Sequence, residues 1–189
     1  MRSLIVTENI SLDGVIETVD GGEASPSGGD DLAAVMREHM AAADAVLLGR
    51  VTYEEFAGYW PAQTSDATGI SDYLNRMTKY VVSSSLTLPS WQNTTVLRGS
   101  LTDHIATLKR EPGKDIVTTG SITLVHWLMR ENLIDAYRLF VYPVVSGRGR
   151  RLFPEGIGAK LRLVETRTFH SGVVLLFYRM MQVDHDGPR

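Results

Sequence analysis

The chain has no cysteine among its 189 residues. This absence excludes disulfide bridges, thiolate metal sites and a cysteine nucleophile. The absence of disulfides is typical of proteins in reducing compartments, so we expect a cytoplasmic location.

The chain also lacks a strong net charge and a long apolar run. Its formal net charge is −3, which gives no electrostatic case for nucleic acid or an anionic membrane as partner. No stretch approaches the roughly 18 apolar residues of a membrane span. The first apolar run is short and soon meets Glu8 and Asp13, unlike a signal peptide. We therefore expect a soluble, intracellular protein that binds neither nucleic acid nor membrane.

Several catalytic and metal-binding motifs are missing as well. The five histidines show no HExxH spacing, so no metal site is predicted. The serines at 83–85 lack the G-x-S-x-G context of a serine hydrolase. The glycine turn at 118–121 is not a G-x-G-x-x-G motif.

What the sequence does contain is a regular alternation of strand and helix patterns. Apolar residues make up 43% and charged residues 22%, an ordinary globular balance, and we expect a single domain over 1–189. The predicted strands are 3–10, 44–49, 79–85, 93–99, 115–120, one within 133–145, 161–169 and 172–183. The predicted helices are 30–43, 52–60, 69–77, 100–113 and 121–132.

This order of elements predicts the fold class. Alternation up to about residue 132 indicates a mostly parallel sheet between two layers of helices, a three-layer α/β/α architecture. The strand-rich remainder adds antiparallel strands at one edge. In open sheets of this kind ligands bind at the carboxyl ends of the strands. Those ends carry Gly49-Arg50, the serines at 83–85 and the turn 118–121.

The stretch after the second strand has two interpretations. A helix start offers unpaired N–H groups and a positive dipole end, Gly49 lets backbone approach a ligand, and Arg50 can pair with phosphate. Thr52 and Glu55 also match a capping box, in which Thr52 only caps the helix. Arg50 can equally form a surface ion pair. The turn at 118–121 is a second small-residue strand-to-helix junction, which is weak evidence by itself.

Together these pieces resemble a known family. SLDGVI at 11–16, LLGRVTYEEF at 47–56, KYVVSSSL at 79–86 and the long run at 120–156 resemble the dihydrofolate reductase-like superfamily. Within it, the chain is most similar to the reductase domain of riboflavin biosynthesis, the RibD C-terminal domain, and its stand-alone relatives. The resemblance covers nearly the whole chain.

The resemblance implies a reductase that takes a hydride from NADPH and passes it to a small heterocyclic or imine-like molecule. It is similar in this to 5-amino-6-(5-phosphoribosylamino)uracil reductase. The implied cofactor-binding residues are Gly49, Arg50, Thr52, Ser83, Ser84, Gly120, Ser121, Ile122 and Thr123. Gly14, Ile16 and Pro143 are expected beside the substrate, and Asp13 or water is expected to donate the proton. Related reductases pair, which implies a homodimer.

Two departures from the pattern leave alternatives open. Dihydrofolate reductases usually have Gly-Gly where this chain has Thr118-Thr119, so bulk there could weaken cofactor binding. Such weakening would fit a non-catalytic nucleotide-binding protein with this fold. Asp31 resembles the acid that holds the pterin ring in a true dihydrofolate reductase, but it also suits an ordinary helix start. The glycine-rich segment 17–30 is predicted to be a loop that can close over the site.

Overall fold

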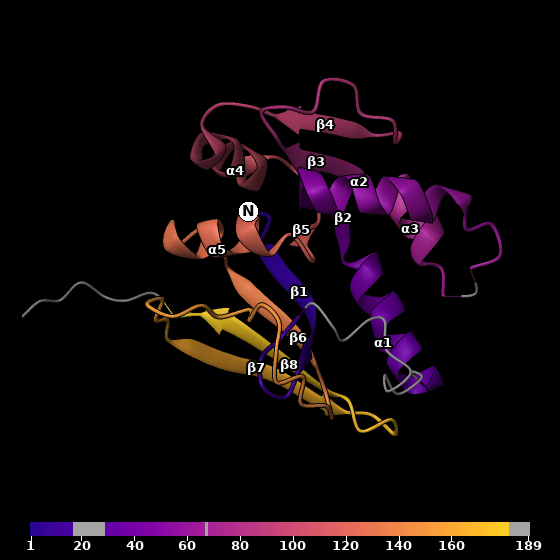
Figure 1. Cartoon of the computed structure of the whole chain (residues 1–189), viewed down its shortest axis with the longest axis vertical. Helices are drawn as coiled ribbons and strands as arrows, with labels where there is room; N and C mark the ends of the chain where they lie inside the picture. Colours follow the sequence, from indigo (N-terminus) through magenta and orange to yellow (C-terminus); the bar gives the residue numbers. More distant parts are fainter. Residues whose placement is uncertain (17–28, 67, 182–189) are drawn as a thin grey trace, which may run out of the picture.

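The computed structural model describes residues 1–16, 29–66 and 68–181. All strands in these ranges join one eight-stranded sheet with the order β4-β3-β2-β5-β1-β6-β8-β7 (Figure 1). The strands are β1 Leu4–Ser11, β2 Ala43–Gly49, β3 Thr78–Val82, β4 Thr94–Leu97, β5 Asp115–Thr118, β6 Ala136–Tyr142, β7 Leu161–Thr168 and β8 Val174–Met180. The predicted loop at 17–30 lies outside the described residues, except for its last two positions.

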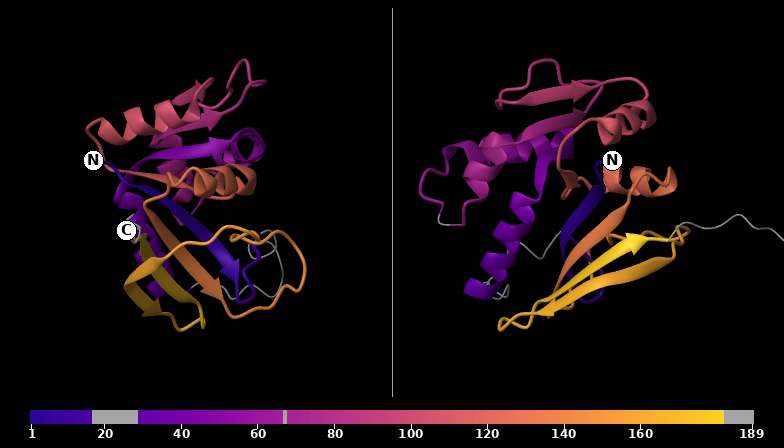
Figure 2. Two further views of the ribbon diagram at one scale, coloured as in Figure 1. Left: turned by 90° about the vertical axis from the view of Figure 1, so that its left-hand side faces the viewer. Right: turned by 180° about the vertical axis from the view of Figure 1, so that it is seen from behind.

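The sheet is parallel from β4 to β6 and antiparallel beyond it. β1 pairs in parallel with both β5 and β6, while β8 pairs antiparallel with β6 and with β7. The view from behind shows β7 and β8 at the end of the sheet opposite β4 (Figure 2, right). This confirms the predicted mostly parallel sheet with antiparallel C-terminal strands.

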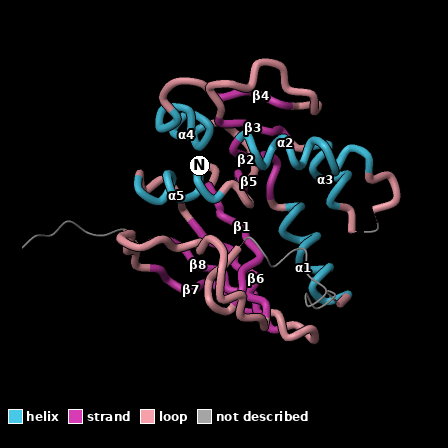
Figure 3. The backbone as a smooth tube through the Cα atoms, viewed as in Figure 1, coloured by secondary structure: helices cyan, strands magenta, loops and turns pink. Residues whose placement is uncertain are grey.

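Helices cover both faces of the sheet. They are α1 Asp30–Ala41, α2 Arg50–Tyr59, the short 3-10 helix η1 Trp60–Ala62, α3 Ile70–Arg76, α4 Leu101–Arg110 and α5 Ile122–Arg130. Figures 1 and 3 show α4 and α5 on one side of the sheet and α1 to α3 on the other. Ser100 caps α4, since its hydroxyl accepts the N–H of Asp103 at 3.3 Å.

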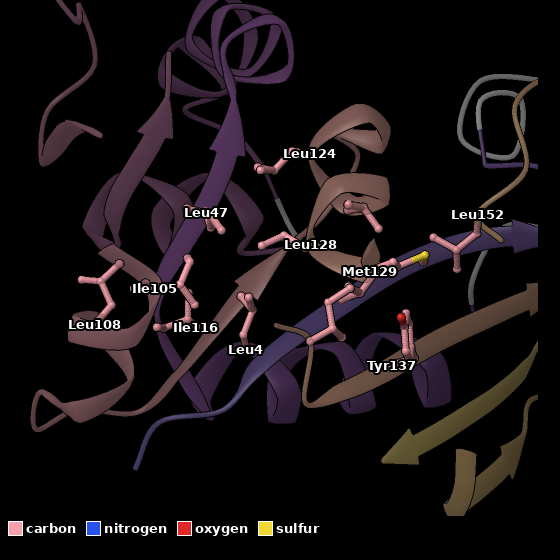
Figure 4. Close-up of a cluster of buried hydrophobic side chains, with 14 of the residues drawn as sticks. Leu4, Leu47, Ile105, Leu108, Ile116, Leu124, Leu128, Met129, Tyr137 and Leu152 are labelled. Atoms are coloured by element: carbon pink, nitrogen blue, oxygen red, sulfur yellow. The ribbon is translucent and has the colours of Figure 1, made fainter. Parts of the chain in front are cut away.

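The main core lies between the sheet and the helices α4 and α5. Figure 4 shows Leu4 and Leu47 from the sheet facing Ile105 of α4 and Leu128 of α5, all fully buried. The side chains of β6 follow the same two-residue period, because successive residues of a strand point to opposite faces. Tyr137, Leu139 and Val141 accordingly pack in this core.

The opposite face of β6 is less uniform. Ala136 and Phe140 pack in the cores under α1 to α3, but Arg138 stands between them in the strand. The Arg138 side chain is nevertheless buried. A strand that is apolar on both faces thus carries one charged residue toward the layer of α1 to α3.

Candidate active site

The starts of three helices meet at the carboxyl edge of the parallel strands. α2 follows β2, α5 follows β5, and α4 starts after β4. They surround a cavity of about 1120 Å³, which we call the cleft. The cleft is lined by Glu8, Ile16, Gly49, Arg50, Val51, Thr52, Glu55, Phe56, Val82, Gly99, Ser100, Leu101, Thr102, Thr119, Gly120, Ser121, Ile122, Thr123, Leu124, Trp127 and Arg150. Because the first turn of each helix has N–H groups without intrahelical acceptors, the cleft is suited to an anion.

Two hydrogen bonds join the starts of α2 and α5. The N–H of Gly49 donates to the Ser121 hydroxyl at 2.9 Å, and the N–H of Ser121 donates to the Thr52 hydroxyl at 3.0 Å. The predicted capping box is therefore wrong: α2 begins at Arg50, its N-cap is Gly49, and no side chain caps it. The hydroxyl of Thr52 accepts from the neighbouring turn instead of from its own helix.

The turn before α5 needs an unusual backbone. Gly120 has φ +59°, and Ser121 adopts the left-handed conformation with φ +44° and ψ +39°. A Cβ on Gly120 would lie 3.1 Å from Cγ2 of Thr52. Glycine is thus required here both for its conformation and for the close approach of Thr52. The strained Ser121 keeps its hydroxyl between the two helix starts.

Arg50 is both a cleft residue and half of an ion pair. Its Nη1 lies 2.7 Å from Oε2 of Glu54, one turn further along α2. The side chains of both residues are more than two-fifths exposed. An exposed pair of this kind contributes little to stability. The two interpretations of Arg50, surface pair and anion ligand, are therefore compatible, because a bound anion can replace Glu54 at little cost.

Ser83 and Ser84, which the resemblance implies as cofactor-binding residues, do not line the cleft. The Ser83 hydroxyl accepts the N–H groups of Ser85 and Leu86 at 3.1 and 2.9 Å, so it shapes its own loop. Ser84 lies in the same loop and is also absent from the cleft wall. Residues 99–102, where α4 begins, line the cleft instead of these serines. A cofactor-binding role of Ser83 and Ser84 stays a prediction from the resemblance.

Only one of the two threonines before Gly120 reaches the cleft. Thr118 is fully buried within the sheet, whereas Thr119 lines the cleft. Bulk at Thr118 therefore does not narrow the cleft. Of the two threonines that replace the usual Gly-Gly, only Thr119 can therefore affect cofactor binding in the cleft.

A second cavity of about 640 Å³, which we call the side pocket, adjoins the cleft on the face of α1 to α3. Glu55, Phe56 and Thr119 line both cavities. The other residues that line the side pocket are Thr7, Asn9, Met36, His39, Met40, Val46, Tyr59, Trp60, Ile70, Tyr73, Leu74, Val117, Arg138 and Phe140. Most of these side chains are apolar or aromatic, as is typical of a pocket for a small organic molecule.

Asp13 lies outside the walls of both cavities. Its carboxylate accepts the Ser11 hydroxyl at 2.6 Å and the N–H groups of Ser146 and Gly147 at 3.0 and 2.8 Å. These bonds, the one from Ser11 first, lower its pKa from 3.8 to about 2. An ionised carboxylate in such a network holds the segment 11–16 against the loop after β6. A catalytic role of Asp13 stays a prediction.

The other residues expected near the substrate are only partly brought together. Ile16 lines the cleft, whereas Gly14 and Pro143 line neither cavity. Gly14 has φ +87°, and its carbonyl accepts the N–H of Leu152 at 2.9 Å. The ring of Pro143 lies beside Gly172, in the turn that precedes β8. The expected contact of Gly14 and Pro143 with a substrate stays a prediction from the resemblance.

Asp31, the candidate pterin acid, is turned toward a hairpin. Its carboxylate accepts the N–H of His170 at 3.0 Å and lies 2.8 Å from Nδ1 of the same histidine. These bonds, the backbone one first, lower its pKa. Asp31 lines neither cavity. It ties the start of α1 to the β7–β8 hairpin.

Sequence reasoning did not single out most residues of the side pocket. Phe56 is one of them, because the sequence of its helix shows only an ordinary apolar face, whereas Thr119 was expected at a strand end. Arg138 had a detectable signal, because it is the one charge in the strand AYRLFVY. Within the described ranges no group of three or more possible ligands forms a metal site, and no helix has the length and hydropathy to cross a membrane.

The comparisons with known proteins agree with this geometry. The family model described as RibD C-terminal domain matches residues 2–175. The uncharacterized protein YyaP of Bacillus subtilis (strain 168) is 30% identical over 184 residues, which is 94% of each chain. A solved structure of a candidate riboflavin biosynthesis protein from Shewanella sp. PV-4 matches with a TM-score of 0.75 and 19% identity, covering 95% of this chain and 99% of that one.

A longer solved protein shares the same fold. It is the diaminohydroxyphosphoribosylaminopyrimidine deaminase/5-amino-6-(5-phosphoribosylamino)uracil reductase from Thermotoga maritima, with a TM-score of 0.66 and 15% identity. The match covers 95% of this chain and 57% of that one. The family model spans nearly the whole chain, and its fold is that of these structures. The chain belongs to the RibD C-terminal domain family.

Proposed function

We propose that the protein is an NADPH-dependent reductase that transfers a hydride to a small heterocyclic or imine-like substrate. The observation that carries this proposal is the junction of the two cavities. The cleft is built from helix starts, whereas the side pocket is mostly apolar, and both are lined by Glu55, Phe56 and Thr119. A two-substrate reductase needs such an arrangement, since cofactor and substrate must meet at one point. The reductase named in the Thermotoga maritima protein supports the same reaction class.

The described residues of the cleft fit a dinucleotide phosphate. The first turns of α2 and α5 provide N–H donors from Arg50 and Ile122 onward, and the bonds between Thr52, Ser121 and Gly49 hold these starts together. Arg50 adds a guanidinium that can pair with a 2′-phosphate. The start of α4 at Ser100 and Leu101 lines the remaining side. These features favour NADPH over NADH, because NADH lacks the phosphate that Arg50 would bind.

The protein's own contribution is orientation and exclusion of water. The hydride chemistry is supplied by the nicotinamide when the cofactor is bound. Phe56 and Thr119 would hold the reacting rings at the junction, and the apolar wall of the side pocket would keep water from the substrate. With its pKa near 2, Asp13 is ionised at neutral pH and is a poor acid, which favours water as the proton source.

The geometry gives less support to the two alternatives. The acid expected for a dihydrofolate reductase was Asp31, which is bonded to His170 and lines neither cavity. A non-catalytic nucleotide-binding protein has no need of the side pocket beside the cleft.

We also propose a cytoplasmic homodimer. Leu163 and Val164, 47% and 45% exposed on the edge strand β7, favour pairing of this edge with a second copy.

A fluorescence titration with NADPH and NADH tests the proposal. Wild type should bind NADPH more tightly than NADH, and Arg50→Ala should reduce that preference by about tenfold or more, as expected for loss of a charge-assisted contact. Arg37→Ala is the matched control, because Arg37 is exposed on α1 and lines neither cavity. Absence of binding of either cofactor at millimolar concentration would reject the reductase.

A further inference from the structure

Arg138 is a buried cation without an ionic partner in the part of the chain that the structure describes. Its side chain leaves β6 on the face of α1 to α3, and the residue is 6% exposed. No hydrogen bond or ion pair of its guanidinium exists among these residues, and its Nε is fully buried and unpaired. Its favourable contact is with the ring of Phe177, whose centre lies 5.4 Å from Cζ. Burial of an unpaired charge is costly, so the position calls for a ligand.

The acidic residues around Arg138 are occupied elsewhere. Burial lowers the pKa of Arg138, and the charges of Asp115, Tyr73, Glu165 and Glu38 oppose this. Glu165 and Glu38 both form ion pairs with Arg167. The carboxylate of Asp115 accepts the N–H of Ser3 at 3.3 Å. The positive charge of Arg138 is thus left uncompensated at short range.

Arg138 lines the side pocket together with two other unsatisfied polar side chains. Thr7 is its partner in the register of β1 and β6, so both side chains leave the sheet on the same face. The Thr7 hydroxyl and Nδ1 of His39 are buried and have no partner among the described residues. Burial is the main cause that lowers the pKa of His39 to about 4, and the charge of Arg138 is the next. The side pocket therefore contains one cation, Arg138, and two neutral polar groups, Thr7 and His39.

The rest of the pocket defines the shape and charge of its occupant. Phe56, Tyr59, Trp60, Tyr73 and Phe140 provide aromatic walls, which suit a planar ring. Arg138 is the single lysine or arginine among the described residues that line the pocket, and Glu55 at the junction is the single acid. One guanidinium neutralises the single charge of one carboxylate or ring oxyanion, whereas it leaves one charge of a phosphate dianion uncompensated.

We propose that the side pocket binds a planar aromatic or heteroaromatic substrate carrying a single anionic oxygen group, and that Arg138 is the residue that selects it. This inference rests on the proposed reductase function and names the substrate class of the same site. Arg138 forms a bidentate ion pair with the anionic group, and the ring lies against Phe56 at the junction with the cleft. Thr7 and His39 contribute hydrogen bonds to the same end of the ligand. Arg138 thereby sets specificity without taking part in the hydride step.

A binding experiment with simple probes tests the assignment. We would titrate 2-naphthoate and its neutral isostere 2-naphthamide into the full chain by calorimetry, with and without saturating NADPH. Wild type should bind the carboxylate at least about tenfold more tightly than the amide, since the pair with Arg138 is charge-assisted. Arg138→Met should abolish the difference, and Arg138→Lys should keep part of it.

The controls separate specificity from folding and from cofactor binding. Arg179→Met makes the same change at an exposed position of the neighbouring strand β8, and it should leave the preference intact. Equal binding of the two probes by wild type, or a preference retained in a folded Arg138→Met protein, would overturn the proposal. Tighter binding of 2-naphthyl phosphate than of 2-naphthoate would overturn the single-charge assignment. If NADPH fails to bind while the preference persists, the reductase function fails and the anion site stands.

Discussion

The backbone N–H of Ser121 donates to the hydroxyl of Thr52 at 3.0 Å, across 69 positions of sequence. This bond connects two helix starts that leave different strands of the sheet. Together with the bond from Gly49 to Ser121 it fixes the spacing of the N–H donors that face the cleft. We therefore expect the affinity of the cleft for an anion to depend on this hydrogen bond between the two helix starts.

Replacing Thr52 by Val tests this coupling. The change removes the acceptor of the partly buried Ser121 N–H with little change in volume, and a donor left unsatisfied in a fully buried position would cost about 1–3 kcal/mol, the upper bound here. We expect a lower unfolding temperature and NADPH affinity reduced by about tenfold. Thr52→Ser keeps the hydroxyl and should behave like wild type. Fluorescence titration and thermal unfolding measure both effects, and an unchanged NADPH affinity in Thr52→Val would show that the bond does not shape the cleft.

Gly120→Ala should be among the more damaging small substitutions. Its Cβ would meet Thr52 at 3.1 Å, and φ of +59° is unfavourable for a residue with a side chain, by about 1–2 kcal/mol. Gly58→Ala is the matched control, because a Cβ there meets nothing within 4 Å and alanine favours a helix by about 0.5–1 kcal/mol. Denaturant unfolding should thus give changes of opposite sign, and equal stability of the two variants would contradict the close approach.

Asp31→Asn distinguishes a structural from a catalytic acid. The bonds from His170 lower the pKa of Asp31 below its ordinary 3.8, so its contribution to stability is full above that pH and is lost as pH falls below it. We expect a variant that is less stable than wild type at neutral pH, with a difference that shrinks in acid, and that still binds NADPH. Thermal unfolding against pH gives the first result. Loss of turnover with full stability would instead favour the dihydrofolate reductase alternative.

Lys79 provides a test in the alkaline range. Its Nζ is buried, donates to the carbonyls of Leu74 and Met77 at 2.6 and 2.9 Å, and lies over the ring of Trp91. Burial lowers its pKa from 10.5 to about 8. Between these two values the unfolded chain holds the proton more tightly than the folded one, so this residue makes stability rise with pH.

Comparison with Lys79→Met isolates that contribution. The difference in free energy of unfolding between wild type and variant should move in favour of wild type as pH rises from about 8 toward 10, because only wild type carries this proton. Urea unfolding at a series of pH values measures it. Parallel curves for the two proteins would show that Lys79 keeps an ordinary pKa in the fold.

Some features of the molecule follow from local sequence. The two-residue period of Tyr137 and Leu139 places them on one face of β6, and Ser100 caps α4 through a residue three positions away. The alternation of strands and helices also determined which strand ends carry Gly49 and Gly120, because parallel connections are right-handed and short. The predicted architecture was confirmed for these reasons: each depends on contacts between residues close in the chain or on a regular repeat.

Other features were decided only by the tertiary structure. Thr52 and Glu55 match a capping box, yet Thr52 bonds to Ser121, since a hydroxyl between two helix starts accepts from whichever donor the packing brings to it. Asp31 meets His170 because the β7–β8 hairpin folds back on α1. The side pocket and the burial of Arg138 arise where β6 passes beneath α1 to α3. Such contacts join distant parts of the chain, and no local pattern encodes the distance between them.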